Sequence, residues 1–130
     1  MNLKKKGVKE ENLEGKIIRG DIFYAELDGA LGSEQNGIRP VIVVQNNTGN
    51  IHSPTTIIVP LTKKINRKNK LPTHLNLKAS GNIKYDSTIL TEQIRTIDKI
   101  RIKEKIGHIE NEYVMQLLDE KIKIALGIKT

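Results

Sequence analysis

The chain has 130 residues, no cysteine, and a formal charge of +7 that arises from 22 lysines and arginines against 15 aspartates and glutamates. This length suits one domain, and the lack of cysteine excludes disulfides, thiolate zinc sites and cysteine-dependent catalysis. No segment approaches the roughly 20 apolar residues that span a bilayer, and the N-terminus lacks the apolar core of a signal peptide. We therefore expect a soluble, cytoplasmic protein. The excess of positive charge points to an anionic partner, nucleic acid being the commonest, and fits an ordinary solvated surface equally well.

Residues 1–16 are poor in apolar side chains and show no periodicity, which predicts a flexible basic extension ahead of a single domain at 17–130. Within that domain, short runs of β-branched residues alternate with clusters of Gly, Asn, Pro and Lys, a pattern typical of strands and turns. No helical period separates the early runs, so their spacing favours a small antiparallel barrel over βαβ units. The expected strands are Ile22–Leu27, Pro40–Gln45, Thr55–Leu61, Thr73–Leu77 and Thr88–Ile94.

Two of the connecting loops carry functional signals. The loop at 28–38 is longer than a tight hairpin and contains Asn36-Gly37, a turn signal. The loop at 63–70 holds five basic residues and no acidic one, which fits a phosphate-contacting loop and a solvated loop equally well.

One long helix is expected near the C-terminus. Asn111 can cap its start, Gly127 can end it, and apolar residues recur between them at helical spacing. These residues are Val114, Leu117, Leu118, Ile122 and Ala125. The predicted fold class is therefore mainly β with a C-terminal α-helix.

Most catalytic signatures are absent from the sequence: there is no P-loop, no Rossmann glycine pattern, no HExxH and no GxSxG. His52, His74 and His108 lie on separate segments without the i,i+4 spacing of a helical zinc site. We therefore expect no metal and no cofactor. A pair of histidines acting as acid and base on RNA remains an alternative.

Several separated motifs together resemble the MazF/PemK/Kid family of toxin endoribonucleases. They are Arg19-Gly20-Asp21-Ile22, GSEQNGIRPVIVVQNNTGN at 32–50, SPTTIIVPLT at 53–62, LPTHL at 71–75 and ILTEQIRTIDKIRI at 89–102. The motifs follow the family's order and cover residues 19–128. The resemblance implies a small SH3-like barrel, the CcdB/PemK-like toxin fold, which forms a homodimer with RNA in a groove across both subunits. Residues 78–86 and the N-terminal extension depart from the family pattern.

The resemblance also implies cleavage of single-stranded mRNA without a metal, by attack of the substrate 2′-hydroxyl on the adjacent phosphorus. The products are a 2′,3′-cyclic phosphate and a 5′-hydroxyl end. By similarity, Arg39 and Thr62 are the catalytic residues. A guanidinium offers a fixed fork of donors to the phosphoryl oxygens, whereas its pKa above ~12 makes it a poor general base. We therefore assign Arg39 to electrostatic stabilisation and Thr62 to one further hydrogen bond.

Further residues are assigned to RNA binding by the same resemblance. Amide, carboxylate and imidazole groups can read the edges of unpaired bases, and basic side chains can contact phosphates, although structural roles are an alternative for each. The set is Arg19, Ser33, Glu34, Gln35, Asn46, Lys70, Leu71, Pro72, His74, Glu92 and Gln93.

The implied partner is a cognate antitoxin, and a basic groove favours one with an acidic, partly disordered segment. Two other functions remain open. One is a gyrase poison built on the same barrel, which would need neither Arg39 nor Thr62. The other is an RNA-binding barrel without catalysis, which would keep the basic groove.

Overall fold

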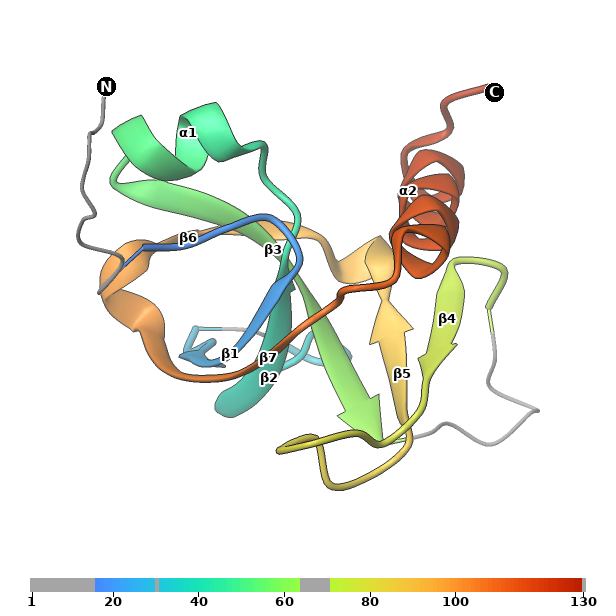
Figure 1. Cartoon of the computed structure of the whole chain (residues 1–130), viewed down its shortest axis with the longest axis horizontal. Helices are drawn as coiled ribbons and strands as arrows, with labels where there is room; N and C mark the ends of the chain where they lie inside the picture. The colour runs from blue at the N-terminus through green and yellow to red at the C-terminus, as the bar shows by residue number, and fades with distance from the viewer. Residues whose placement is uncertain (1–15, 30, 64–70, 130) are drawn as a thin grey trace.

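The computed structural model describes residues 16–29, 31–63 and 71–129 of the chain (Figure 1). Strands dominate, and the one long helix lies at the C-terminal end. The strands are β1 Asp21–Glu26, β2 Ile38–Val43, β3 Thr55–Lys63, β4 His74–Leu77, β5 Ser87–Leu90, β6 Arg95–Asp98 and β7 Ile102–His108. The helices are α1 Asn47–His52 and α2 Glu112–Leu126, with 3-10 turns η2 Thr91–Gln93 and η3 Lys99–Arg101.

The sheet is antiparallel and centres on β3. Its strand order is β4-β5-β3-β2-β1-β7, and β6 also pairs with β3. One edge of β3 meets β2, while the other edge meets β6 along its first half and β5 along its last residues. Because β6 and β7 are consecutive in the chain and pair with β3 and β1, the sheet bends into a barrel-like shape without a closed hydrogen-bonded ladder.

The sheet is buried on both faces. One apolar cluster joins Ile22, Ile42 and Leu61 to Leu118 of α2, and a second joins alternate residues of β1, β2 and β3, including Val41, to Ile97 of β6. Successive strand residues point to opposite faces, so β2 contributes to both clusters in turn. This double burial explains why 41–44 reads as one unbroken apolar run.

Helix α2 begins and ends where the sequence predicts. The Asn111 side chain accepts hydrogen bonds from the backbone N–H groups of Tyr113 and Val114, and Gly127 adopts the left-handed conformation at φ 72°. Leu118 is fully buried, which anchors the helix on the sheet. None of the helices in the described ranges is long and apolar enough to cross a membrane.

The mainly β class with a C-terminal helix is confirmed, and each of the five expected strands has a counterpart. One expected strand is too long: Thr88–Ile94 ends at Leu90, because Thr91–Gln93 forms η2 and the N–H of Ile94 donates to the Thr91 carbonyl. The short helix α1 and strands β6 and β7 were not predicted. The predicted extension 1–16 lies outside the described residues except for Lys16, so the domain division stays a prediction.

Removing the anchor of α2 is expected to destabilise the whole domain. Leu118→Ala leaves a cavity under α2 and should lower the free energy of unfolding by about 2–5 kcal/mol, measured by urea denaturation. Ile124→Ala is the matched control, because Ile124 lies on the same helix and is exposed. Equal effects of the two substitutions would contradict the assignment of Leu118 as the anchor.

Candidate functional site

The two residues assigned to catalysis come together through the register of β2 and β3. The pairs Ile42–Val59 and Val41–Pro60 set that register, and continuing it by two residues brings Arg39 opposite Thr62. No β2–β3 pair follows Val41–Pro60, and the next residue of β2, Pro40, has no N–H to donate to β3. Directly opposed residues share a face. The ladder therefore ends just before the position where Arg39 and Thr62 face each other.

The Arg39 side chain is exposed and held at one end. Its Nε donates to the carbonyl of Asn36 at 2.8 Å, across the turn where Gly37 has φ 77°. Asn36-Gly37 is the turn signal of the sequence, and its left-handed glycine is a conformation that other residues adopt at a cost. The structure gives the two Nη groups no partner among the residues it describes, which leaves their donors available to an anion.

A cavity of about 330 Å³ lies beside this position. It lies between the loop after β1 and the η2 turn, and we call it the loop cavity. Its polar lining includes four residues of the predicted RNA-binding set: Glu34, Gln35, Glu92 and Gln93. Leu27, Gly29, Pro60, Ile94 and Arg95 complete the lining. The structure thus brings together the two motifs GSEQN and TEQIR, which are far apart in the sequence.

Gln93 ties the loop to η2 through both ends of its amide. Its Oε1 accepts from the backbone N–H of Gln35 at 2.7 Å, and its Nε2 donates to the carbonyl of Ser33 at 3.1 Å. The Oε1 atom of Gln35 is buried and has no hydrogen-bond partner among the described residues. A buried acceptor without a donor is costly, so this loop position gains stability from any donor group that reaches it.

Glu92 lines the loop cavity and contacts His74, which lines a second cavity of about 520 Å³. The other residues of that lining are Leu71, Pro72, Leu75, Asn76 and Lys121. The Nδ1 atom of buried His74 accepts from the N–H of Leu71 at 3.1 Å. Its Nε2 lies 3.1 Å from Glu92 Oε2, so both nitrogens of the ring are engaged and the imidazole is held in place.

The carboxylate of Glu92 is held in its ionised form. Burial alone would raise its pKa, but hydrogen bonds from the Thr73 hydroxyl, its own backbone N–H and His74 outweigh that effect and lower the pKa below its ordinary value. The Thr73 hydroxyl donates at 2.7 Å. A fixed negative charge at this junction disfavours phosphate and favours amino groups, such as those on base edges.

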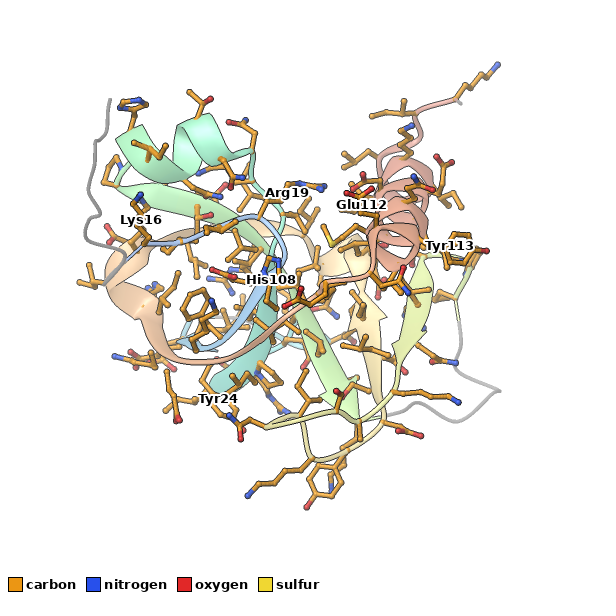
Figure 2. The ribbon with its side chains drawn as sticks, in the orientation of Figure 1. Lys16, Arg19, Tyr24, His108, Glu112 and Tyr113 are labelled. Atoms are coloured by element: carbon orange, nitrogen blue, oxygen red, sulfur yellow. The ribbon has the colours of Figure 1, made fainter. Side chains whose placement is uncertain are left out.

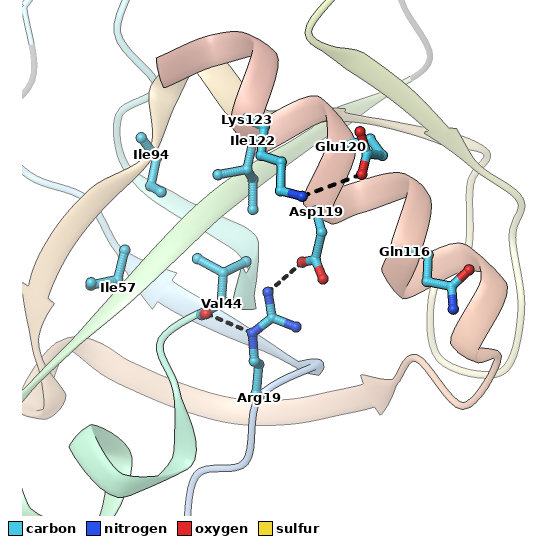
Figure 3. Close-up of a pocket in the computed structure, with 9 residues that line it drawn as sticks. All are labelled: Arg19, Val44, Ile57, Ile94, Gln116, Asp119, Glu120, Ile122 and Lys123. Carbon is cyan, nitrogen blue, oxygen red and sulfur yellow. Dashed lines mark hydrogen bonds and ion pairs between the residues drawn. The ribbon is translucent and has the colours of Figure 1, made fainter. Parts of the chain in front are cut away.

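Two residues of the predicted set lie elsewhere. Arg19 faces a different cavity, of about 450 Å³, where its guanidinium donates to the Val44 carbonyl and pairs with Asp119 of α2 (Figures 2 and 3). Asn46 caps α1 by accepting from the N–H of Gly49 at 2.8 Å. Both side chains thus have structural partners. Lys70 lies outside the described residues.

The structure also adds residues that motif reasoning did not single out. Thr73 holds Glu92, Lys121 of α2 donates to the Pro72 carbonyl at 2.9 Å and lines the second cavity, and Arg95 lines the loop cavity. Thr73 and Arg95 lie within the motifs LPTHL and TEQIR, so those motifs were a usable signal; Lys121 had none. Among the described residues, no group of three or more His, Asp or Glu side chains is arranged to hold a metal ion.

Residues 18–126 match the family model of the PemK-like, MazF-like toxins of type II toxin–antitoxin systems. The chain belongs to this family. It is 48% identical over 113 residues to the endoribonuclease EndoA of Bacillus subtilis, covering 86% of this chain and 96% of the relative. It is 47% identical to the endoribonuclease MazF of Staphylococcus saprophyticus, covering 86% and 92% of the two chains. These relatives confirm the predicted enzyme class, endoribonuclease.

Solved structures confirm the fold of these toxins for this chain. A MazF crystal structure from Deinococcus radiodurans superposes with a TM-score of 0.74 at 20% identity, covering 87% of this chain and 98% of that one. The toxin MazF-mt6 of Mycobacterium tuberculosis gives 0.70 at 20% identity, with coverages of 85% and 99%. A mycobacterial endoribonuclease in complex with its cognate antitoxin gives 0.69 at 22% identity, with coverages of 88% and 98%.

The hydrogen bonds to Glu92 predict a specific dependence of stability on pH. Because its pKa is lower in the folded chain, its contribution is present above the pKa of the unfolded chain, about 4.3, and is lost as pH falls through the folded value. Glu92→Gln should therefore lower the free energy of unfolding at pH 7, and the difference from wild type should shrink below about pH 4.

Urea denaturation from pH 7 to pH 3 measures this difference. Glu104→Gln, at an exposed position on β7, controls for the loss of one negative charge. A difference between Glu92→Gln and wild type that stays constant over the whole pH range would show that the carboxylate is not stabilised in this way.

Proposed function

We propose that this protein is the toxin of a type II toxin–antitoxin system and cleaves single-stranded mRNA at specific sequences without a metal ion. In this reaction the substrate 2′-oxygen forms a bond to the adjacent phosphorus and the P–O5′ bond breaks. The products are a 2′,3′-cyclic phosphate and a 5′-hydroxyl end. The observation that carries the proposal is the β2–β3 register, which sets Arg39 opposite Thr62 when it is continued beyond Val41–Pro60. Pro60 also lines the cavity that holds the amide and carboxylate side chains.

Arg39 acts by stabilising negative charge. Attack of the 2′-oxygen builds charge on the nonbridging oxygens of the phosphate, and donors already aimed at that charge account for much of the rate acceleration in many enzymes. The Nε–Asn36 hydrogen bond fixes the base of the guanidinium and leaves its Nη donors for those oxygens. Thr62, half-buried at the end of β3, adds a neutral donor from the opposite strand.

Base recognition takes place in the loop cavity and in the second cavity, which the Glu92–His74 contact connects. Glu92 accepts hydrogen bonds from base amino groups, while Gln35 and Gln93 offer both donors and acceptors to base edges. Leu71 and Pro72 provide apolar contact beside His74. These groups read unpaired bases, because the Watson–Crick edges they contact are occupied in a duplex.

The proposal for catalysis is tested with purified protein and a long single-stranded RNA in excess chelator, by mapping the fragment ends. We expect discrete cuts with 5′-hydroxyl and cyclic phosphate ends. Arg39→Ala should lower kcat by about 100-fold or more while largely sparing RNA binding. Thr62→Val should lower it about three- to tenfold, the value of one hydrogen bond. Arg39→Lys keeps the positive charge but lacks the planar fork of donors, so its kcat should lie between those of wild type and Arg39→Ala.

Other outcomes would replace the proposal. Cleavage that needs added metal after chelation would contradict the metal-free reaction. RNA that is bound and left intact by the wild type would indicate a binding module. Intact RNA together with inhibition of DNA gyrase would indicate a gyrase poison.

The partners follow from charge and from the family. We propose a homodimer in the cytoplasm, held inactive by an antitoxin whose acidic, partly disordered segment complements the net charge of +7 on this chain. Pull-down of the tagged protein from its host should recover such an acidic chain, released by salt, and sedimentation should give twice the mass of one chain. Recovery of neutral, folded partners alone would contradict this antitoxin chemistry.

A further inference from the structure

The connection between β4 and β5 presents, two residues before β5 begins, an aromatic ring that the proposed function does not use. Tyr85 is 59% exposed, and the ammonium group of Lys63 lies 4.4 Å from the centroid of its ring. Exposed rings are scarce in this chain, which has one phenylalanine, three tyrosines and no tryptophan. Phe23 is buried, so base stacking depends on very few candidates.

The backbone that carries Tyr85 is held on both sides. The Ser87 hydroxyl donates to the Tyr85 carbonyl at 3.0 Å, and the Asp86 carboxylate accepts from the Ala79 N–H at 2.9 Å across the hairpin connection. The ring is therefore presented from a hydrogen-bonded turn, with the ammonium group of Lys63 against it. The connection that carries the ring, 78–86, holds two further basic residues, Lys78 and Lys84, and one acidic residue, Asp86. Such a surface suits an aromatic contact with a nucleotide whose phosphates lie near lysines.

The ring lies near the catalytic pair but not in the loop cavity. Lys63 directly follows the proposed catalytic threonine, Thr62, on β3. Both pair with β5, Thr62 with Thr88 and Lys63 with Ser87. Successive side chains of a strand point to opposite faces. Lys63, at the end of β3, therefore points to the opposite face of the sheet from Thr62 and Arg39, and the Tyr85 ring lies with Lys63. An RNA strand with its cleaved phosphate at Arg39 and Thr62 reaches Tyr85 by crossing that end of the strand.

We propose that Tyr85 stacks on an unpaired base that flanks the cleaved phosphate, with Lys63 contacting a neighbouring phosphate. This inference rests on the proposed ribonuclease function and adds a contact outside both cavities. A ring stacks on any base, so Tyr85 contributes to affinity more than to the choice of sequence. It is a binding residue, and its effect belongs in KM rather than in kcat.

The test compares Tyr85→Ala with Tyr85→Phe, which keeps the ring, and with Tyr113→Ala. Tyr113 is a matched control because it is 65% exposed and lies on α2, on a different part of the molecule from the connection between β4 and β5 (Figures 1 and 2). The probes are short single-stranded RNAs with 2-aminopurine at successive positions around the mapped cut. A 2′-O-methyl group at the cut nucleotide blocks cleavage during binding.

We expect binding to change 2-aminopurine fluorescence at one flanking position with wild type and Tyr85→Phe, and not with Tyr85→Ala. Tyr85→Ala should raise Kd and KM at least about fivefold, the lower end for one stacked base, with kcat unchanged at saturation. Wild-type Kd and fluorescence in Tyr85→Ala, or an equal loss in Tyr113→Ala, would overturn the inference. If wild type cuts RNA and Tyr85→Ala behaves as wild type, this inference alone fails; if wild type leaves RNA intact, the proposed function fails.

Discussion

The double burial of β2 and β3 is the constraint on which the rest of the structure depends. Ile58, Val59 and Leu61 are fully buried, with side chains entering clusters on both faces of the sheet. Between Ile57 and Leu61, strand β3 carries no polar side chain, because an unpaired buried polar group costs several kcal/mol. Polar chemistry is therefore confined to the places where these strands end, and Arg39 and Thr62 stand at two such places.

A proline in β2 turns that constraint into a site. Val41–Pro60 is the last β2–β3 pair, and Pro40, the next residue of β2, has no N–H to donate to β3, while β3 goes on to pair with β5. The two strands thus lose their mutual hydrogen bonds at the level of Arg39 and Thr62, which the same register sets opposite each other. Pro60, two residues before Thr62, lines the loop cavity.

Local sequence patterns predicted only part of the fold, and the roles assigned to the site residues stay predictions. Short apolar runs and helix caps report local structure, so five strands and α2 were predicted. Strand β7 is mostly exposed, with Lys103, Glu104 and Lys105 in succession, and it exists because its backbone pairs with β1. Helix α1 looked like a loop because of its Asn and Gly residues. Buried Asn50 stabilises it by bonding Gln45 and Thr56, contacts that no local pattern reveals.

The motif residues also have roles in the structure that a family pattern does not separate from function. Gln93 is both a base-reading candidate and the link between η2 and the loop at Ser33 and Gln35. A base that takes over one of its hydrogen bonds must release part of that link, and the unpaired Oε1 of Gln35 offers the loop a new partner when it shifts. Ligand binding in the loop cavity and the position of the loop are thereby coupled through the same few hydrogen bonds. A ligand that binds one position of the loop more tightly than another shifts the equilibrium between the two positions toward the first, by an amount set by the difference between its two affinities.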